Sequence, residues 1–186
     1  MIQKTVKIDN KIIGYNKPVY IISEIGSNHN QSFDMAIEMI ERSAKAGADA
    51  VKFQSIQYKE LYNPKKESKE FNQWFKQIEL REEWYPKLFL KAKECGVHFL
   101  SSPTYLEAIN LLVDIGVPAL KIASPQVQGN LPLLRKAAAS GKTLILSLGY
   151  CDYGDIIRAL KICEEERNNN LILLHCISKY PAYPKD

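Results

Sequence analysis

The stretch Gly47-Ala-Asp-Ala-Val-Lys-Phe-Gln54 contains the junction on which the whole chain is built. Gly47 ends a predicted helix, and a short strand over residues 50–54 follows at once. The same junction, a helix-stopping glycine followed by a short apolar run, recurs at Gly96, Gly116 and Gly141. Regular alternation of strands and helices predicts an α/β fold with parallel strands.

The pattern predicts six such strands with helices between them. The strands are expected at 19–25, 50–54, 98–101, 119–122, 143–148 and 171–175. The helices are expected at 30–46, 83–95, 106–115, 131–139 and 155–167. Residues 5–13 read as a small hairpin, and residues 58–77 as an irregular loop with one helical turn over the strand ends.

Two architectures commonly arise from this alternation, the closed (β/α)8 TIM barrel and the open doubly wound sheet. The chain contains neither GxGxxG nor GxxxxGK[ST], so no nucleotide-binding signature supports the open sheet. A barrel takes about 250 residues, and this chain has 186. We therefore predict a lead-in over 1–18 and a TIM barrel over 19–186 that covers about six βα units and lacks the last two.

Composition excludes several classes of protein. The net charge is only +4, which is far from the footprint of a nucleic-acid-binding protein. No apolar run is long enough for a membrane span, and residues 1–10 do not resemble a signal peptide. The four cysteines include no CxxC pair, which is typical of reduced thiols. A cytoplasmic enzyme or binding domain is expected.

Polar side chains gather where the predicted strands end. Chemistry in parallel α/β folds lies at the carboxyl ends of the strands. Lys52 and Lys121 lie inside apolar strands, and a buried lysine is costly unless an anion or a carboxylate meets it. Together with nearby hydroxyls they indicate a site for phosphate and carboxylate groups. Either lysine alone can also be interpreted as a strand-end residue whose side chain reaches water. The serines can also be interpreted as turn residues.

The positions of the three histidines along the chain predict different roles for them. His98 opens a strand at the end opposite the site and reads as structural. His175 is expected to be a core histidine with a satisfied ring. His29 remains open between a ligand and a loop residue.

Five motifs occur in order, each at the end of a predicted strand. They are Ser23-Glu-Ile-Gly-Ser-Asn-His-Asn30, Gly47-Ala-Asp-Ala-Val-Lys-Phe-Gln54, Phe99-Leu-Ser-Ser-Pro103, Lys121-Ile-Ala-Ser124 and Leu174-His-Cys-Ile-Ser-Lys-Tyr-Pro181. Together they closely resemble the sialic acid synthase family, which includes N-acetylneuraminate, legionaminate and pseudaminate synthases. The resemblance extends from about Val19 to Asp186.

The resemblance implies a transferase that condenses phosphoenolpyruvate with an N-acetylated amino sugar and releases phosphate. It assigns Glu24 to the reacting carbons as the catalytic residue, and Gln54 and Tyr180 to the border of the sugar. The residues that it assigns to phosphoenolpyruvate are Lys52, Ser102, Lys121, Ser124, Ser147, Ser178 and Tyr180.

The same resemblance implies a divalent metal, Mn²⁺ or a similar ion. No residue of this chain matches a metal ligand, because the family's two ligand histidines are expected beyond Asp186. A small antifreeze-like domain is also expected there, and the full-length form is expected to be a homodimer. Two positions depart from the family pattern: Gln126 stands where many members have a carboxylate, and Ser178 where many have Asn.

Two other functions remain open at this point. Lys52 or Lys121 is also suited to be the Schiff-base lysine of a TIM-barrel aldolase. The chain is also compatible with a non-catalytic fragment that binds phosphorylated ligands. The sequence does not select one amino sugar among those used by the family.

Overall fold

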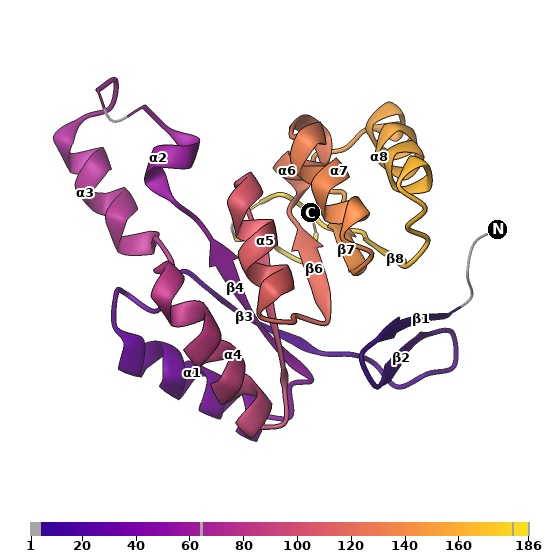
Figure 1. Ribbon diagram of the computed structural model, residues 1–186, viewed down its shortest axis with the longest axis horizontal. Coiled ribbons are helices and arrows are strands. Elements are labelled where there is room, and N and C mark those ends of the chain that lie inside the picture. Colours follow the sequence, from indigo (N-terminus) through magenta and orange to yellow (C-terminus); the bar gives the residue numbers. More distant parts are fainter. Residues whose placement is uncertain (1–4, 64, 180, 186) are drawn as a thin grey trace.

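A computed structural model describes residues 5–63, 65–179 and 181–185 (Figure 1). Its strands are β1 (Thr5–Ile8), β2 (Lys11–Gly14), β3 (Ile22–Gly26), β4 (Ala50–Ser55), β5 (His98–Pro103), β6 (Ala119–Ile122), β7 (Thr143–Ser147) and β8 (Leu171–Leu174). Its helices are α1 (Phe33–Lys45), α2 (Tyr58–Leu61), α3 (Lys69–Ile78), the 3₁₀ turn η1 (Glu82–Trp84), α4 (Tyr85–Glu94), α5 (Leu106–Asp114), α6 (Ser124–Gly129), α7 (Leu131–Ala139) and α8 (Tyr153–Glu165).

The six strands β3 to β8 follow one another in space as they do in the chain. β3, β4 and β5 form one parallel sheet, and β6, β7 and β8 form another. β5 and β6 pack beside each other, although no ladder of hydrogen bonds joins them within the described residues. The predicted α/β class and its parallel strands are confirmed, as is the separate antiparallel hairpin β1–β2.

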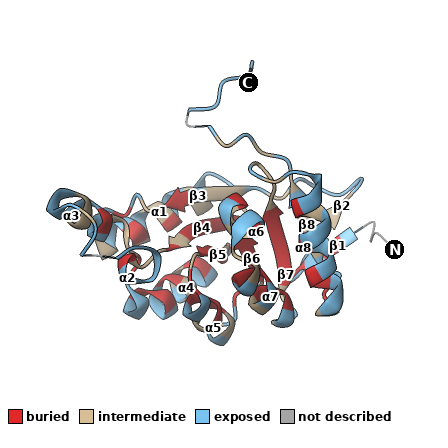
Figure 2. Cartoon of the chain, turned by 90° about the horizontal axis from the view of Figure 1, so that it is seen from above, coloured by how far each residue is buried: buried red, intermediate tan, exposed pale blue. Residues whose placement is uncertain are grey.

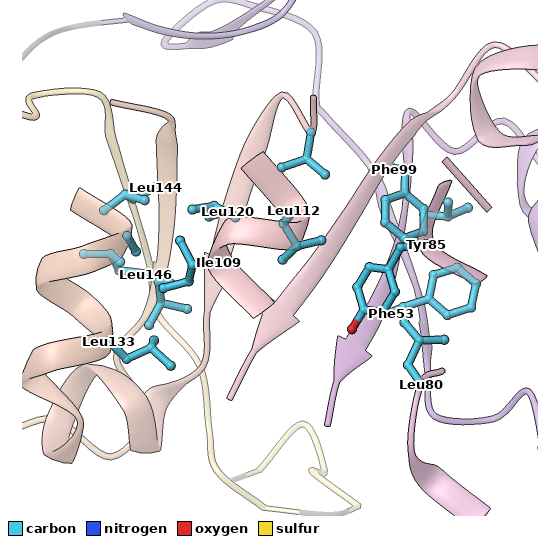
Figure 3. Close-up of a cluster of buried hydrophobic side chains, with 14 of the residues drawn as sticks. Phe53, Leu80, Tyr85, Phe99, Ile109, Leu112, Leu120, Leu133, Leu144 and Leu146 are labelled. Atoms are coloured by element: carbon cyan, nitrogen blue, oxygen red, sulfur yellow. The ribbon is translucent and has the colours of Figure 1, made fainter. Parts of the chain in front are cut away.

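Alternation of side chains along the strands gives two apolar clusters. Residues such as Phe53, Phe99 and Leu120 face the helices and form the larger cluster, shown in Figure 3. In Figure 2 the strands β4 to β7 are mostly red, and the outward faces of the helices are pale blue. The side chains of the larger cluster are therefore shielded from water by the helices that connect the strands.

The opposite faces of the strands carry the smaller cluster, which contains a residue of the hairpin. Ile8 of β1 is fully buried among Ala50, Leu100, Ala119 and Ile145. The Thr143 hydroxyl donates a 2.7 Å hydrogen bond to the Lys7 carbonyl, which ties the hairpin to β7. The hairpin thus packs against the amino-terminal part of the inner face and leaves the carboxyl-terminal part to polar side chains.

The prediction of an irregular loop over 58–77 was wrong. α2 and α3 occupy most of that segment. The Ser68 hydroxyl caps α3 by accepting a hydrogen bond from the Phe71 N–H. Phe75, one turn further along, packs against Tyr58 and Tyr62 of the preceding segment, with ring centroids 5.2 and 5.0 Å apart. This aromatic face stabilises a helix whose periodicity is hidden by the charged residues around it.

Three smaller expectations also changed. α6 begins at Ser124, directly after β6, where no helix was predicted. The first parallel strand begins at Ile22 and not at Val19, which is exposed. His175 is exposed, so the expectation of a core histidine was wrong.

Candidate active site

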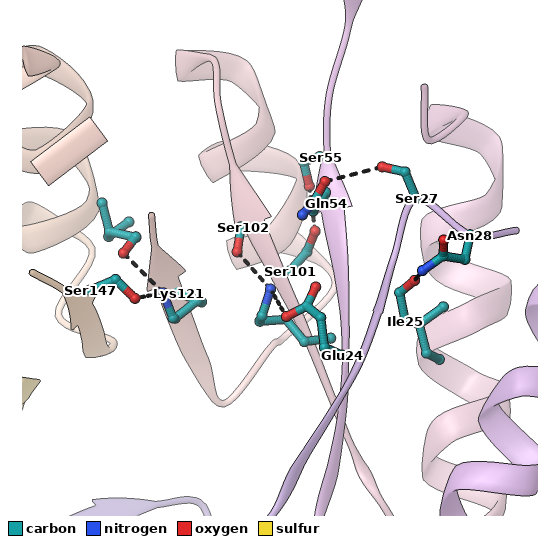
Figure 4. A network of polar contacts seen from close by, with 12 residues as sticks. Glu24, Ile25, Ser27, Asn28, Gln54, Ser55, Ser101, Ser102, Lys121 and Ser147 are labelled. Carbon is teal, nitrogen blue, oxygen red and sulfur yellow. Dashed lines mark hydrogen bonds and ion pairs between the residues drawn. The ribbon is translucent and has the colours of Figure 1, made fainter. Parts of the chain in front are cut away.

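A buried lysine occupies the middle of the inner face, between two neighbouring strands. Lys52 of β4 is only 7% exposed. Its ammonium lies 2.5 Å from a carboxylate oxygen of Glu24 on β3 and donates a 3.1 Å hydrogen bond to the Ser102 hydroxyl on β5. Figure 4 shows Glu24 and Ser102 approaching from opposite sides. Each adjoining strand thus supplies one partner that offsets the cost of burying this charge.

A second lysine lies on the same face of the other sheet, in different surroundings. Lys121 of β6 is also 7% exposed. It donates hydrogen bonds to the Ser147 hydroxyl on β7, at 2.5 Å, and to the Ile122 carbonyl, at 3.2 Å. In the described part of the chain it forms no ion pair with a carboxylate. This ammonium therefore has hydroxyl and carbonyl partners but no counterion beside it.

The protonation of Lys121 depends on its burial and on the other lysine. Burial, together with the positive charge of Lys52, lowers the pKa of Lys121 to about 8. The negative charges of Cys176 and Glu24 act in the opposite direction. The electrostatic coupling among these side chains joins the two lysines into one polar site.

The loops that follow β6, β7 and β8 meet beside Lys121. The Gly149 N–H donates a 3.0 Å hydrogen bond to the Ser124 hydroxyl, which lies 3.6 Å from the sulfur of Cys176. A Cβ atom on Gly149 would lie 2.4 Å from the Ser178 hydroxyl oxygen, so only glycine allows this approach. Ser124 and Ser178 are therefore held close together by backbone packing at position 149.

Gln54 lies at the edge of the site formed by β3 and β4. Its side-chain oxygen accepts a 3.2 Å hydrogen bond from the Ser27 hydroxyl. Gly26 has a φ of 60°, which turns the chain at the end of β3. A carboxylate oxygen of Glu24 and the amide nitrogen of Gln54 both lie within 4 Å of the position that a Cβ on Gly26 would take. The carboxylate and the amide therefore border the same turn.

The structure brings together all but one of the residues selected from the sequence. Tyr180 lies outside the described residues. His29 does not join the group, because its ring is buried against Trp84 and Phe53 on the side of the helices, with centroids 5.6 and 6.5 Å away. Burial lowers the pKa of His29, and its Nδ1 accepts a 3.3 Å hydrogen bond from the Gln31 N–H. These contacts favour the loop assignment over a ligand.

Cys176 is the site residue that sequence reasoning missed. It was interpreted only as one reduced thiol among four. The signal for it was its position two residues beyond the last strand and two residues before Ser178, because side chains two apart in extended chain face the same way.

The described residues do not assemble a metal site of their own. No group of three or more His, Cys, Asp and Glu side chains among them is arranged to hold an ion. Glu24 is engaged by Lys52. In the same part of the chain, every helix is too short or too polar to cross a membrane.

Known proteins resemble the chain in both sequence and fold. N,N'-diacetyllegionaminic acid synthase of Campylobacter jejuni is 37% identical over 179 residues, covering 89% of this chain and 53% of that protein. The N-acetylneuraminic acid (sialic acid) synthetase of Leptospira borgpetersenii, solved in complex with citrate, superimposes with a TM-score of 0.89 at 34% identity, covering 97% of this chain and 62% of that one. The chain spans about half the length of the curated relatives that it matches.

A more distant structure shares the fold alone. A truncated 3-deoxy-D-arabino-heptulosonate 7-phosphate synthase of Thermotoga maritima superimposes with a TM-score of 0.67 at 14% identity, covering 94% of this chain and 58% of that one. The architecture is therefore that of a TIM-barrel-like α/β protein. A model of the NeuB family matches residues 39–186, which is most of the chain. The chain belongs to the NeuB family of sialic acid synthases, as its motifs predicted.

Proposed function

We propose that this chain carries the phosphoenolpyruvate site of a nonulosonic acid synthase, which joins phosphoenolpyruvate to an open-chain N-acetylated amino sugar. The observation that carries the proposal is the buried Lys121 ammonium, which lacks a carboxylate partner among the described residues. A buried cation surrounded by hydroxyl donors is a favourable environment for a phosphate or a carboxylate group. Membership of the NeuB family supports this class of substrate.

The anion is proposed to bind closer to Lys121 than to Lys52. The Glu24 carboxylate already neutralises Lys52 at 2.5 Å. Lys121, the Ser124 and Ser147 hydroxyls and Ser178 remain to receive the phosphate and carboxylate oxygens. Ser102, which accepts a hydrogen bond from Lys52, is proposed to border the bound phosphoenolpyruvate on the side of Lys52.

Glu24 is proposed to act on the reacting carbons. The methylene carbon of phosphoenolpyruvate attacks the sugar aldehyde and forms a carbon–carbon bond as the C=O π bond opens. The aldehyde oxygen takes up a proton from solvent, and positive charge develops at the former enol carbon. Water adds at that carbon, and phosphate leaves with cleavage of its C–O bond. An ionised carboxylate stabilises the positive charge or accepts a proton of the water. The ammonium of Lys52, 2.5 Å away, holds this side chain in place.

The remaining parts of the proposal concern the sugar and the whole protein. Gln54 and Tyr180 are proposed to border the N-acetylated amino sugar. We also propose that β3 to β8 are six of the eight strands of a barrel, that the whole protein is a homodimer, and that a divalent metal such as Mn²⁺ is held by ligands outside these residues.

The test is an assay of phosphate release with the full-length protein, phosphoenolpyruvate, Mn²⁺ and a panel of N-acetylated amino sugars. Release that requires one sugar of the panel supports the proposal, and a nine-carbon acid identified by mass spectrometry completes it. Phosphoenolpyruvate that binds but releases no phosphate with any sugar favours a non-catalytic binding protein instead.

A Schiff-base aldolase is a second candidate, favoured by one observation. With a pKa of about 8, a substantial share of Lys121 is neutral near physiological pH, as a nucleophilic amine must be. In that reaction the amine and a carbonyl substrate form an imine and release water. Borohydride reduction with pyruvate present would then leave a stable adduct on Lys121. The synthase predicts no adduct.

A further inference from the structure

Cys176 shares its surroundings with the proposed anion site. Its sulfur lies 3.6 Å from the Ser124 hydroxyl, which also accepts the Gly149 N–H. A Cβ built on Gly149 would lie 3.0 Å from the same sulfur, so the thiol packs directly against the loop after β7. The side chain is nevertheless partly exposed. The thiol is thus reachable from solvent at the place where an anion would lie.

The groups around Cys176 favour its ionised form. Partial burial raises the pKa of the thiol, whereas hydrogen bonds from the Ser124 and Ser147 hydroxyls lower it. The backbone N–H groups at 148 and 149 act in the same direction, so the net pKa lies below its ordinary value. The charge of this thiolate also acts on Lys121. The donors that would receive a phosphate therefore also stabilise a thiolate.

The other cysteines provide a comparison within the same chain. Burial raises the pKa of Cys163 to about 11. Partial burial, with nearby acidic groups, also raises the pKa of Cys151. Because the thiolate is the reactive form, a reagent added to the folded protein should distinguish Cys176 from these two.

We propose that Cys176 is a covalent modification site for thiol-reactive electrophiles, peroxide included, and that a bound phosphate-type anion protects it. The occupant of the site is taken from the proposed function. Protection follows from geometry, because an oxyanion on Lys121 and Ser124 would cover the sulfur and compete for the same donors. Modification should in turn close the site to anions.

The chemistry of each modification is simple. With iodoacetamide, the sulfur electron pair forms an S–C bond while the C–I bond breaks and iodide leaves. With peroxide, an S–O bond forms, the O–O bond breaks, and hydroxide leaves. The sulfur is oxidised to a sulfenic acid, and the peroxide is reduced.

The experiment follows iodoacetamide labelling of each cysteine by peptide mass spectrometry, in inorganic phosphate or in sodium chloride of equal ionic strength. In chloride, Cys176 should react faster than Cys151 and Cys163, because surrounding hydrogen bonds lower the pKa of Cys176 whereas burial raises the pKa of the other two. Phosphate and phosphoenolpyruvate should each slow Cys176 alone. Equal rates for Cys176 and Cys151, or equal rates in phosphate and chloride, overturn the inference.

A matched variant tests the effect of modification on binding. After iodoacetamide treatment, the wild-type protein should bind phosphate at least tenfold more weakly in calorimetry. Cys176→Ser should bind after treatment as it did before. If the wild type keeps its affinity after complete labelling, the thiol does not line the site. If phosphate protects Cys176 but the protein shows no synthase turnover, this inference is supported and the proposed function is contradicted. Failure of the inference and failure of the proposed function therefore give different results.

Discussion

The ammonium of Lys52 lies 2.5 Å from a carboxylate oxygen of Glu24 on the neighbouring strand, so this buried lysine carries its own counterion. Lys121, equally buried, has hydroxyl and carbonyl partners instead. The two lysines therefore have different roles although both lie inside strands. Under the proposed function, Lys52 holds Glu24 in place through this ion pair, and Lys121 is the cation that remains for an anionic substrate.

Replacing Lys121 with alanine should weaken the binding of phosphoenolpyruvate. A hydrogen bond to a charged group contributes about 1.5–3 kcal/mol, or roughly 10- to 150-fold in dissociation constant. Calorimetry measures the change. Lys161→Ala, an exposed lysine on the outer helix α8, is the matched control and should leave binding unchanged. Equal affinity of Lys121→Ala and wild type would remove Lys121 from the site.

Anion binding should weaken as the pH rises through about 8. Below that value Lys121 is charged, and above it the amine is neutral, because burial and Lys52 lower its pKa to about 8. Ionisation of Cys176 adds negative charge as the pH rises and acts in the same direction. Calorimetry with sulfate, whose own charge is constant in this range, measures the effect.

Two variants separate the contributions to this pH dependence. Lys121→Arg stays charged in the alkaline range, so its affinity should fall less steeply with pH. Cys176→Ser should keep most of the fall. An affinity that does not change between neutral and alkaline pH in the wild type would contradict the assigned protonation of Lys121.

The sequence was sufficient to predict the strands and the convergence of most of the selected side chains, and the reason is geometric. Parallel strands end at one edge, so Lys52, Ser102 and Lys121 were predicted to meet without knowledge of any contact. The pairing of Lys52 with Glu24 required the register of β3 against β4, which places these two residues opposite each other. Composition alone does not determine such a register.

The failures of prediction have an equally specific cause. Cys176 was overlooked because the hydroxyls and N–H groups that lower the pKa of its thiol come from other elements of the fold. α3 was overlooked because its aromatic face is stabilised by Tyr58 and Tyr62, from outside the helix. In both cases tertiary contacts determine the property, and a local pattern does not contain them.

Truncation of Ile8 should test how strongly the hairpin is attached. Ile8 is fully buried in the inner cluster. Ile8→Ala should lower the free energy of unfolding by about 2–5 kcal/mol, the usual range for a buried Ile to Ala change. Ile12→Ala, on the other strand of the hairpin and 48% exposed, should change it much less. Urea unfolding followed by circular dichroism compares them, and equal losses would contradict the buried position of Ile8.

Replacing Glu24 with glutamine should separate binding from catalysis. The amide keeps the shape of the side chain but removes the charge that contacts Lys52. In the full-length enzyme, kcat should fall strongly, by about 100-fold or more if Glu24 transfers a proton. The dissociation constant of phosphoenolpyruvate should stay the same or improve, because Lys52 is then free to meet the anion. A parallel loss of binding and turnover would make Glu24 a substrate-holding residue.

Adding one methyl group at Gly149 should disrupt the site through its backbone. A Cβ there would lie 2.4 Å from the Ser178 hydroxyl oxygen and 2.9 Å from the Cys176 carbonyl oxygen, and the carbonyl cannot rotate away as a side chain can. Gly149→Ala should therefore displace the segment after β8 and weaken phosphate binding by at least tenfold in calorimetry. Gly129→Ala is the control, because nothing lies within 4 Å of its Cβ position. Both variants should retain the circular dichroism spectrum of a folded protein. If Gly149→Ala binds phosphate as Gly129→Ala does, the loops after β7 and β8 do not jointly form the anion site.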